Sequence, residues 1–268
     1  MKKNKRIGVL IDELTGNPSK LYDSKHFCEK FDIAKSSLSE DIKIANEIFS
    51  ENGSGHIESI SGVGGGIKFI PGISDSDIVN LQNILIQKLS DPSRILGGGF
   101  LYTADIMYDS RFVRDMARIF ADRFSKLNAN YVVTVETKGI PLAAQVAFML
   151  NLPLVVIRRE AMYSEGSTVS INYFSGSTQG IAKMSIAKRA VRPDTEAIVI
   201  DDFMKGGGSI QGVKNILSEF EIQVVGIGVA LEAREPEKKK IKNYNSILII
   251  DEIDEENRAI KICPSVNL

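Results

Sequence analysis

Residues 197–210 read Ala-Ile-Val-Ile-Asp-Asp-Phe-Met-Lys-Gly-Gly-Gly-Ser-Ile, and this run decides the fold class. Its apolar start predicts a buried strand, and the pattern after the glycines predicts a helix. Glycines let backbone N–H groups surround a phosphate, Ser209 adds a hydroxyl, and the helix presents the positive end of its dipole. The adjacent carboxylates of Asp201 and Asp202 can accept hydrogen bonds from two ribose hydroxyls or hold Mg²⁺. The run therefore predicts a site for a ribose phosphate.

The run does not match two well-known glycine-loop motifs. A Walker loop needs Gly-Lys-Ser or Gly-Lys-Thr after four spacers, and a Rossmann loop has no acid pair ahead of its glycines. A plain turn between a strand and a helix explains Gly206 to Gly208 and leaves the acid pair unexplained. Two further triplets, Gly64 to Gly66 and Gly97 to Gly99, show that glycine position is informative along the whole chain.

Around this run, short apolar segments alternate with amphipathic ones. The expected strands are 131–135, 154–157, 197–200 and 224–231, and the expected helices are 112–124, 141–150 and 209–220. Strands of this kind with intervening helices indicate an α/β domain whose parallel sheet is covered on both faces. Ligands on such sheets bind at the carboxyl ends of the strands, which is where the acid pair stands.

Two other segments agree with this interpretation. Residues 132–143 read Val-Val-Thr-Val-Glu-Thr-Lys-Gly-Ile-Pro-Leu-Ala, a strand that ends in a short turn before a helix, and residues 154–159 read Leu-Val-Val-Ile-Arg-Arg. Together with the acid pair and glycine loop, they resemble the type I phosphoribosyltransferase family, whose substrate is phosphoribosyl pyrophosphate (PRPP). The resemblance implies the parallel-sheet fold of that family for most of the chain.

The resemblance also implies a role for each matching residue. Asp201 and Asp202 are expected on the ribose, the backbone of Thr137, Lys138 and Gly139 on the diphosphate, and Arg159 facing the diphosphate. The residues expected around the remaining phosphate are Met204, Lys205, Gly206, Gly207, Gly208 and Ser209. PRPP is the implied ligand, with Mg²⁺ as an accompanying ion.

Weaker candidates surround this predicted site. Phe203 is expected against a purine-like ring and Tyr102 over the ligand from a hood segment, although an aromatic residue at a strand end is more often part of the core. Residues 238–242 contain four lysines that offer a secondary phosphate contact or simply a solvated face. Residues 160–192 stand where the family has a mobile loop that closes over PRPP.

The first seventy residues follow a different pattern. Three helices are expected, one carrying the apolar stripe from Ile7 to Leu14, a second capped by Ser24 and a third capped by Asp32. Two short strands, 56–61 and 67–70, then surround a glycine-rich turn. This order resembles a winged helix-turn-helix module, which implies that the third helix enters the major groove of DNA and the hairpin lies along the backbone.

Small polar and basic side chains supply the expected DNA contacts. The candidates are Lys35, Ser36, Ser39 and Lys43 on the third helix, Gly64, Gly65 and Lys68 in the wing, and Lys3 and Arg6 at the chain start. Glu40 and Glu47 share the exposed face of that helix and would repel phosphates. The alternative is therefore a small helical cap with a solvated face.

The combination of the two modules is more specific than either. A winged helix domain over residues 1–74 followed by a phosphoribosyltransferase domain over residues 75–268 resembles the purine operon regulators of Gram-positive bacteria. Residues 165–173 and 184–189 match that family closely. The resemblance implies a homodimer that binds operator DNA, represses or activates genes of purine synthesis and salvage, and reads PRPP as an effector.

The same resemblance implies that catalysis is lost. Many purine enzymes of the phosphoribosyltransferase family carry an acid after the acid pair that contacts the base, whereas residues 203–206 here contain none. The alternatives are a working purine phosphoribosyltransferase with an N-terminal appendage, and a regulator whose cleft takes a competing nucleotide.

Composition limits the remaining classes. The 268 residues carry 33 basic and 34 acidic side chains, so no global charge attracts DNA and any contact must come from local placement. Cys28 and Cys263 lie far apart, which argues against a disulfide or zinc framework. The chain also lacks a signal-peptide core and an apolar run of about 20 residues, so a cytoplasmic location is expected.

Overall fold

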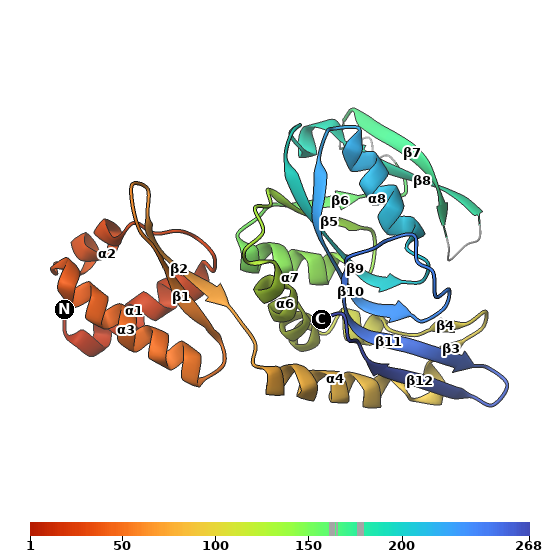
Figure 1. Ribbon diagram of the computed structural model, residues 1–268, viewed down its shortest axis with the longest axis horizontal. Helices are drawn as coiled ribbons and strands as arrows, with labels where there is room; N and C mark the ends of the chain where they lie inside the picture. Colours follow the sequence, from red (N-terminus) through yellow and green to blue (C-terminus); the bar gives the residue numbers. More distant parts are fainter. Residues whose placement is uncertain (161–163, 165, 176–179) are drawn as a thin grey trace.

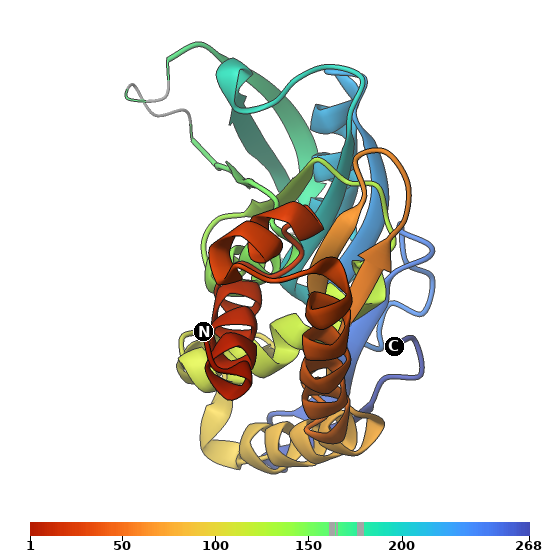
Figure 2. The ribbon, with the colours of Figure 1, turned by 90° about the vertical axis from the view of Figure 1, so that its left-hand side faces the viewer.

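A computed structural model describes residues 1–160, 164, 166–175 and 180–268 of the chain (Figure 1). Its N-terminal part is a winged helix domain. The elements are α1 (Lys3–Gly16), α2 (Ser24–Phe31), α3 (Lys35–Glu51), β1 (Gly55–Ile60) and β2 (Gly66–Pro71). The two strands form an antiparallel hairpin, and their side chains pack with those of the three helices around Phe27, Leu38 and Phe49. Figure 2 shows α1 and α3 side by side with the hairpin along one edge.

The winged helix was predicted from sequence, but two of its caps were not. The Asp23 carboxylate, and not Ser24, accepts the N–H of Lys25 at the start of α2. Asp32 ends α2 in the left-handed conformation, with φ of 53°, and α3 begins after Ala34 without a side-chain cap. Asp tolerates this conformation better than most residues. Asp32 therefore makes the turn between α2 and α3 instead of capping α3.

Helix α4 (Asp75–Leu89) joins the two domains. Ser74 Oγ accepts the N–H of Asp77 at 3.1 Å and caps the helix. Leu81, Leu85 and Leu89 are buried against the second domain, and Gln82 donates to the carbonyl of Ile247 there. Figure 1 shows α4 running from the winged helix beneath the large sheet.

The second domain is built on a six-stranded sheet in the order β12-β11-β10-β9-β5-β6. The strands are β5 (Tyr131–Val135), β6 (Leu154–Ile157), β9 (Glu196–Met204), β10 (Gln223–Ala233), β11 (Asn245–Asp254) and β12 (Ala259–Pro264). All neighbours are parallel except β11 and β12. The predicted parallel sheet is thus confirmed, and β11 and the antiparallel edge strand β12 are additions to it.

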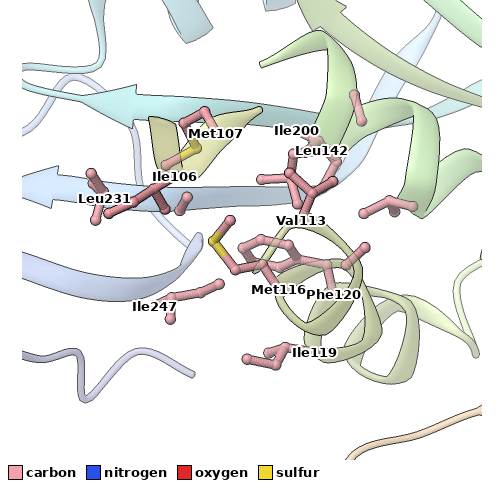
Figure 3. Packing of buried hydrophobic residues seen from close by; sticks show 14 of the residues in the cluster. Ile106, Met107, Val113, Met116, Ile119, Phe120, Leu142, Ile200, Leu231 and Ile247 are labelled. Carbon is pink, nitrogen blue, oxygen red and sulfur yellow. The ribbon is translucent and has the colours of Figure 1, made fainter. Parts of the chain in front are cut away.

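Helices cover both faces of the sheet, as predicted. One face packs against α4, α5 (Ala104–Met107), α6 (Ser110–Phe124) and α7 (Ile140–Leu150). Figure 3 shows side chains of α5, α6 and α7 converging with Ile200, Leu231 and Ile247 of the sheet. The other face packs against α8 (Gly208–Ser218). Gly228 of β10 permits this density, because a Cβ there would lie 2.7 Å from the ring of Phe120.

The described part of residues 160–192 forms a regular hairpin. Strands β7 (Thr168–Ser175) and β8 (Gly180–Ala187) pair as an antiparallel hairpin that packs on α8 through Tyr173 and Met184. The closing of this stretch over PRPP stays a prediction. No helix of the described residues is both long and apolar enough to cross a membrane.

Candidate functional site

A cleft of about 400 Å³ opens at the carboxyl ends of β5, β9 and β10. The lining residues are Gly98, Gly99, Phe100, Leu101, Thr103, Val135, Glu136, Thr137, Lys138, Arg159, residues 201–210, Ala233, Ile250 and Ile253. Segments 137–138, 159 and 201–209, which the sequence singles out separately, thus meet in one place. The parallel strands bring them together, because their carboxyl ends share one edge of the sheet.

The acid pair forms the floor of the cleft. Asp201 is 8% exposed, and its Oδ1 accepts the N–H of Asp202 at 2.9 Å. Burial raises the pKa of Asp201 well above its usual range, and the charge of Asp202 adds to the shift. Burial also raises the pKa of Asp202, against the nearby positive charges of Lys138 and Arg159. Ligand hydroxyls or a cation would relieve the cost of holding these carboxylates ionised.

The glycine loop follows directly and turns into α8. Gly207 has φ of +77° and precedes the first residue of the helix. A Cβ at Gly207 would lie 2.9 Å from Cγ1 of Ile241, which is 3% exposed. Glycine is therefore required for both conformation and space. The loop presents backbone N–H groups and the helix N-terminus to the cleft, as an anion site needs.

The turn after β5 forms the opposite wall. The peptide bond between Glu136 and Thr137 is cis, and Gly139 precedes α7. A Cβ at Gly139 would lie 2.9 Å from Oδ1 of Asp201, so this turn and the acid pair fit closely. Glu136 accepts the N–H of Arg159 at 2.6 Å and pairs with Arg158 at 3.2 Å. These contacts hold Arg159 at the edge of the cleft beside Lys138.

Tyr102 is a correction. It is 46% exposed and is not among the residues that line the cleft. It directly follows the hairpin of β3 (Ile95–Leu96) and β4 (Phe100–Leu101). Phe100 and Leu101 line the cleft instead, and Gly98 and Gly99 form the hairpin turn with positive φ.

Sequence reasoning also missed the apolar wall supplied by Ile250 and Ile253 of β11. The run Ser-Ile-Leu-Ile-Ile at 246–250 reads as a buried strand and could have located it. Phe203 lies in the cleft as expected and also packs on the main core.

The lysine-rich loop at 238–242 lies behind the glycine loop. The backbone N–H of Lys240 donates to the carbonyl of Gly206 at 3.0 Å. The ammonium group of Lys239 donates to the carbonyls of Ala233 and Arg234. None of these lysines lines the cleft, so the loop supports the phosphate loop from outside.

The exposed face of α3 forms a second candidate surface. Lys35, Ser36, Ser39 and Lys43 are all exposed, as their helical positions predict. The wing between β1 and β2 projects beside this helix domain, with Val63 fully exposed and Gly64 at φ of +79° (Figure 1). Gly65 and Gly66 are packed against backbone carbonyls, so the triplet both turns and closes the hairpin.

Arg6 departs from its predicted role. Its guanidinium pairs with Asp41 through two contacts, at 2.8 and 3.2 Å, and Asp41 is completely buried. The Arg6 side chain is itself only 12% exposed, so it holds α1 to α3 and is not free for DNA. The Lys3 side chain is 44% exposed and pairs with Glu40, whereas that of Lys68 is only 19% exposed and pairs with Glu58.

Comparison with known families divides the chain as the structure does. Residues 2–71 match the family described as bacterial purine repressor, N-terminal, and residues 104–261 match the phosphoribosyl transferase domain. These ranges fall within the winged helix domain and the sheet domain.

Similar proteins cover nearly the whole chain. A probable purine biosynthesis transcriptional regulator PurR of Streptococcus pneumoniae is 39% identical over 98% of this chain and 96% of its own length. The purine biosynthesis transcriptional repressor PurR of Bacillus subtilis is 39% identical over 97% and 92%. The corresponding activator of Lactococcus lactis is 34% identical over 98% and 97%.

Solved structures match the sheet domain. An adenine phosphoribosyltransferase of Rhodothermus marinus superposes with a TM-score of 0.52 at 15% identity, covering 64% of this chain and 99% of that enzyme. At this identity the likeness establishes the fold of the domain.

Proposed function

Because the chain belongs to the family of purine biosynthesis transcriptional regulators, we propose that its cleft binds PRPP as an effector rather than as a substrate. The winged helix domain binds DNA, and the regulated genes serve purine biosynthesis. We also propose that the protein regulates genes of purine salvage and that it is located in the cytoplasm, where bacterial DNA lies.

One observation carries the proposal. The buried acid pair, residues 137–138 of the turn after β5 and the glycine loop line one cleft. Groups suited to a ribose and to the phosphates at both ends of PRPP are therefore combined in one place. Asp201 and Asp202 would accept the ribose hydroxyls, the turn would hold the diphosphate with Arg159, and residues 204–209 would hold the remaining phosphate.

Mg²⁺ fits this arrangement as a companion of the ligand. Among the described residues no group of three or more His, Cys, Asp or Glu could hold a metal by itself. Mg²⁺ commonly uses one or two carboxylates together with phosphate oxygens and water, so Asp201 or Asp202 could share the ion with the diphosphate. The ion would neutralise charge between the carboxylates and the phosphates.

The proposal that catalysis is absent rests on the wall opposite the phosphates. Where a base would lie, the described wall consists of apolar side chains, among them Phe100, Phe203, Ile250 and Ile253. Among the described residues that line the cleft, the carboxylates are those of Glu136, which pairs with Arg158 and accepts the N–H of Arg159, and of Asp201 and Asp202, which the proposal assigns to the ribose. None of these is left to handle the proton of a purine. The described part of the β7–β8 hairpin packs on α8 and adds nothing to the cleft that would exclude water.

Asp202→Ala tests effector binding. PRPP affinity measured by calorimetry should fall by at least about a hundredfold, because a ribose contact is lost beside a buried partner. Basal DNA affinity should stay within about twofold of wild type. Glu219→Ala, which removes an exposed carboxylate at the end of α8, should change neither quantity. Unchanged PRPP affinity of the Asp202 variant would contradict the proposal.

A direct assay separates the regulator from an enzyme. The chain incubated with PRPP, Mg²⁺ and each purine base should form no nucleotide at an enzymatic rate. Rapid nucleotide formation would favour a working purine phosphoribosyltransferase with a DNA-binding appendage.

The apolar wall supports a second ligand for the same cleft. An aromatic ring would bury the exposed edge of Phe100, so a nucleotide carrying phosphates could compete with PRPP. Calorimetric titration with guanosine polyphosphates, with and without saturating PRPP, measures this competition. A signal unaffected by PRPP would place the nucleotide elsewhere.

We also expect a homodimer. Winged helix and helix-turn-helix regulators commonly place two copies on two half-sites, which doubles the contact with DNA. Light scattering of the full chain measures the mass against the 29.4 kDa of one copy.

A further inference from the structure

The two ends of the wing hairpin are held by one side chain of the other domain. Arg118 of α6 donates from Nε to the carbonyl of Gly72 and from Nη2 to the carbonyl of Gly53, both at 2.8 Å. Gly53 lies just before β1 and Gly72 just after β2. In the part of the chain that the structure describes, no salt bridge engages Arg118, and these two carbonyls are its hydrogen-bond acceptors.

The base of the hairpin offers Arg118 only backbone. The N–H of Gly72 donates to the carbonyl of Ser54, which brings the two ends of the hairpin together. Gly55 has φ of +137°, and a Cβ there would lie 2.1 Å from the carbonyl oxygen of Ile70. The two ends of the hairpin therefore pass too closely for side chains to lie between them. The planar guanidinium of Arg118 donates to the carbonyls on each side of this crossing.

The cleft and the winged helix lie at opposite ends of the sheet. In Figure 1 the arrows of β9 and β10 point away from the winged helix domain, and the cleft lies at their carboxyl ends. Signals between the two sites must therefore cross the domain. Two packed helices, α6 and α7, run along this direction on one face of the sheet.

Helix α6 connects to the cleft through α5, which precedes it in the chain. Thr103 lines the cleft and precedes α5, and Asp109 then caps α6 by accepting the N–H of Arg111. Arg94 binds Asp105 of α5 through two contacts at 2.7 Å and also donates to the carbonyl of Tyr102. The hairpin of β3 and β4, here called the hood, is thus tied to α5 and to the start of α6, and Arg118 extends from α6.

We propose that Arg118 is a positioning residue that clamps the wing to α6 and transmits occupancy of the cleft to the DNA-binding surface. Movement of the hood over a ligand would shift α6 along the sheet and, through Arg118, the base of the wing. The identity of that ligand rests on the proposed function, whereas the clamp itself does not. A second contact, from Ser19 Oγ to the carbonyl of Met149 at 2.7 Å, keeps the domains together when Arg118 is replaced.

Arg118→Met tests the clamp without any ligand. Hydrogen exchange of the full chain should become faster in residues 53–74 and stay unchanged in β9 and α8. Arg123→Met, an exposed arginine on the same helix, should leave residues 53–74 as in wild type. Unchanged exchange in the Arg118 variant would overturn the clamp, whatever the cleft binds.

The same variants test transmission. DNA from upstream of a purine biosynthesis gene is titrated with and without saturating PRPP, and the ratio of the two Kd values is compared. In wild type we expect this ratio to differ from 1 by a factor of about 5 to 150. In Arg118→Met the ratio should fall to about 1, while PRPP affinity stays within about twofold of wild type. Arg118→Lys keeps one donor group, so its ratio of Kd values should lie between those of wild type and Arg118→Met.

Three results discriminate the possible failures. A wild-type ratio in Arg118→Met would overturn transmission through this residue. Loss of PRPP affinity in that variant would also overturn it, because Arg118 would then support the cleft itself. A wild type that binds no PRPP would refute the proposed effector, while the exchange experiment would still decide the clamp.

Discussion

At the scale of the residue, Asp201 shows how a ligand site is built at a cost to the fold. Its side chain is buried, and its nearest charged neighbour along the chain is another carboxylate. Such positions are typical of functional sites, where stability is given up for binding. The sequence indicates this pair directly, because two acids after an apolar strand have no other evident use.

Asp201→Asn should stabilise the ligand-free protein at neutral pH. The pKa of Asp201 is raised above its ordinary value of 3.8, so the folded state holds its proton more tightly than the unfolded state does. Stability is therefore lost as the pH rises from the ordinary pKa through the raised one. Asn removes this loss, and the free energy of unfolding at pH 7 should rise by about 1 to 3 kcal/mol.

Denaturant titrations at pH 4 and pH 7 measure this effect. The gain from Asn should be larger at pH 7, and PRPP affinity should fall in the same variant. A variant less stable than wild type at pH 7 would mean that the Asp201 carboxylate stabilises the fold.

Arg6→Met should unfold the winged helix domain first. The substitution leaves Asp41 buried without its charge partner, and breaking a buried pair in this way costs about 3 to 5 kcal/mol. Calorimetric scans should show an early transition for this domain, with the PRPP-dependent transition of the sheet domain in place. Intact folding combined with weaker DNA binding would instead return Arg6 to the DNA surface.

At the scale of the element, α3 carries the prediction for DNA. Lys43→Glu reverses a charge on its exposed face, and DNA affinity at low salt should fall by about two or more factors of ten, with a smaller dependence on salt. Lys126→Glu makes the same change on an exposed part of the sheet domain and serves as control. Equal affinities for both variants and wild type would move recognition away from α3.

Local patterns predicted most helices and the central strands, because each apolar run or stripe there lies within one element. The β7–β8 hairpin was missed, although Val169, Ile171 and Tyr173 alternate with polar residues as in a strand with one buried face. Local patterns also missed the wall made by Phe100 and Ile253, since distant elements bring these residues to the cleft.

At the scale of the whole molecule, the two sites lie at opposite ends of one sheet and share the helices between them (Figure 1). Motifs predicted both sites, but their separation and the contact of Arg118 with the wing depend on how the domains pack. No local pattern marks an arginine that binds two carbonyls in another domain. The proposed route of coupling through Arg118 therefore comes from the structure and not from the sequence.

The central claim is that PRPP controls DNA binding. The most direct test measures the Kd of the full chain for DNA from upstream of a purine biosynthesis gene, at constant salt, with and without PRPP. We predict a change in Kd of at least about fivefold, in wild type and not in Asp202→Ala. Identical Kd values with and without PRPP, for wild-type protein that binds this DNA, would contradict the account.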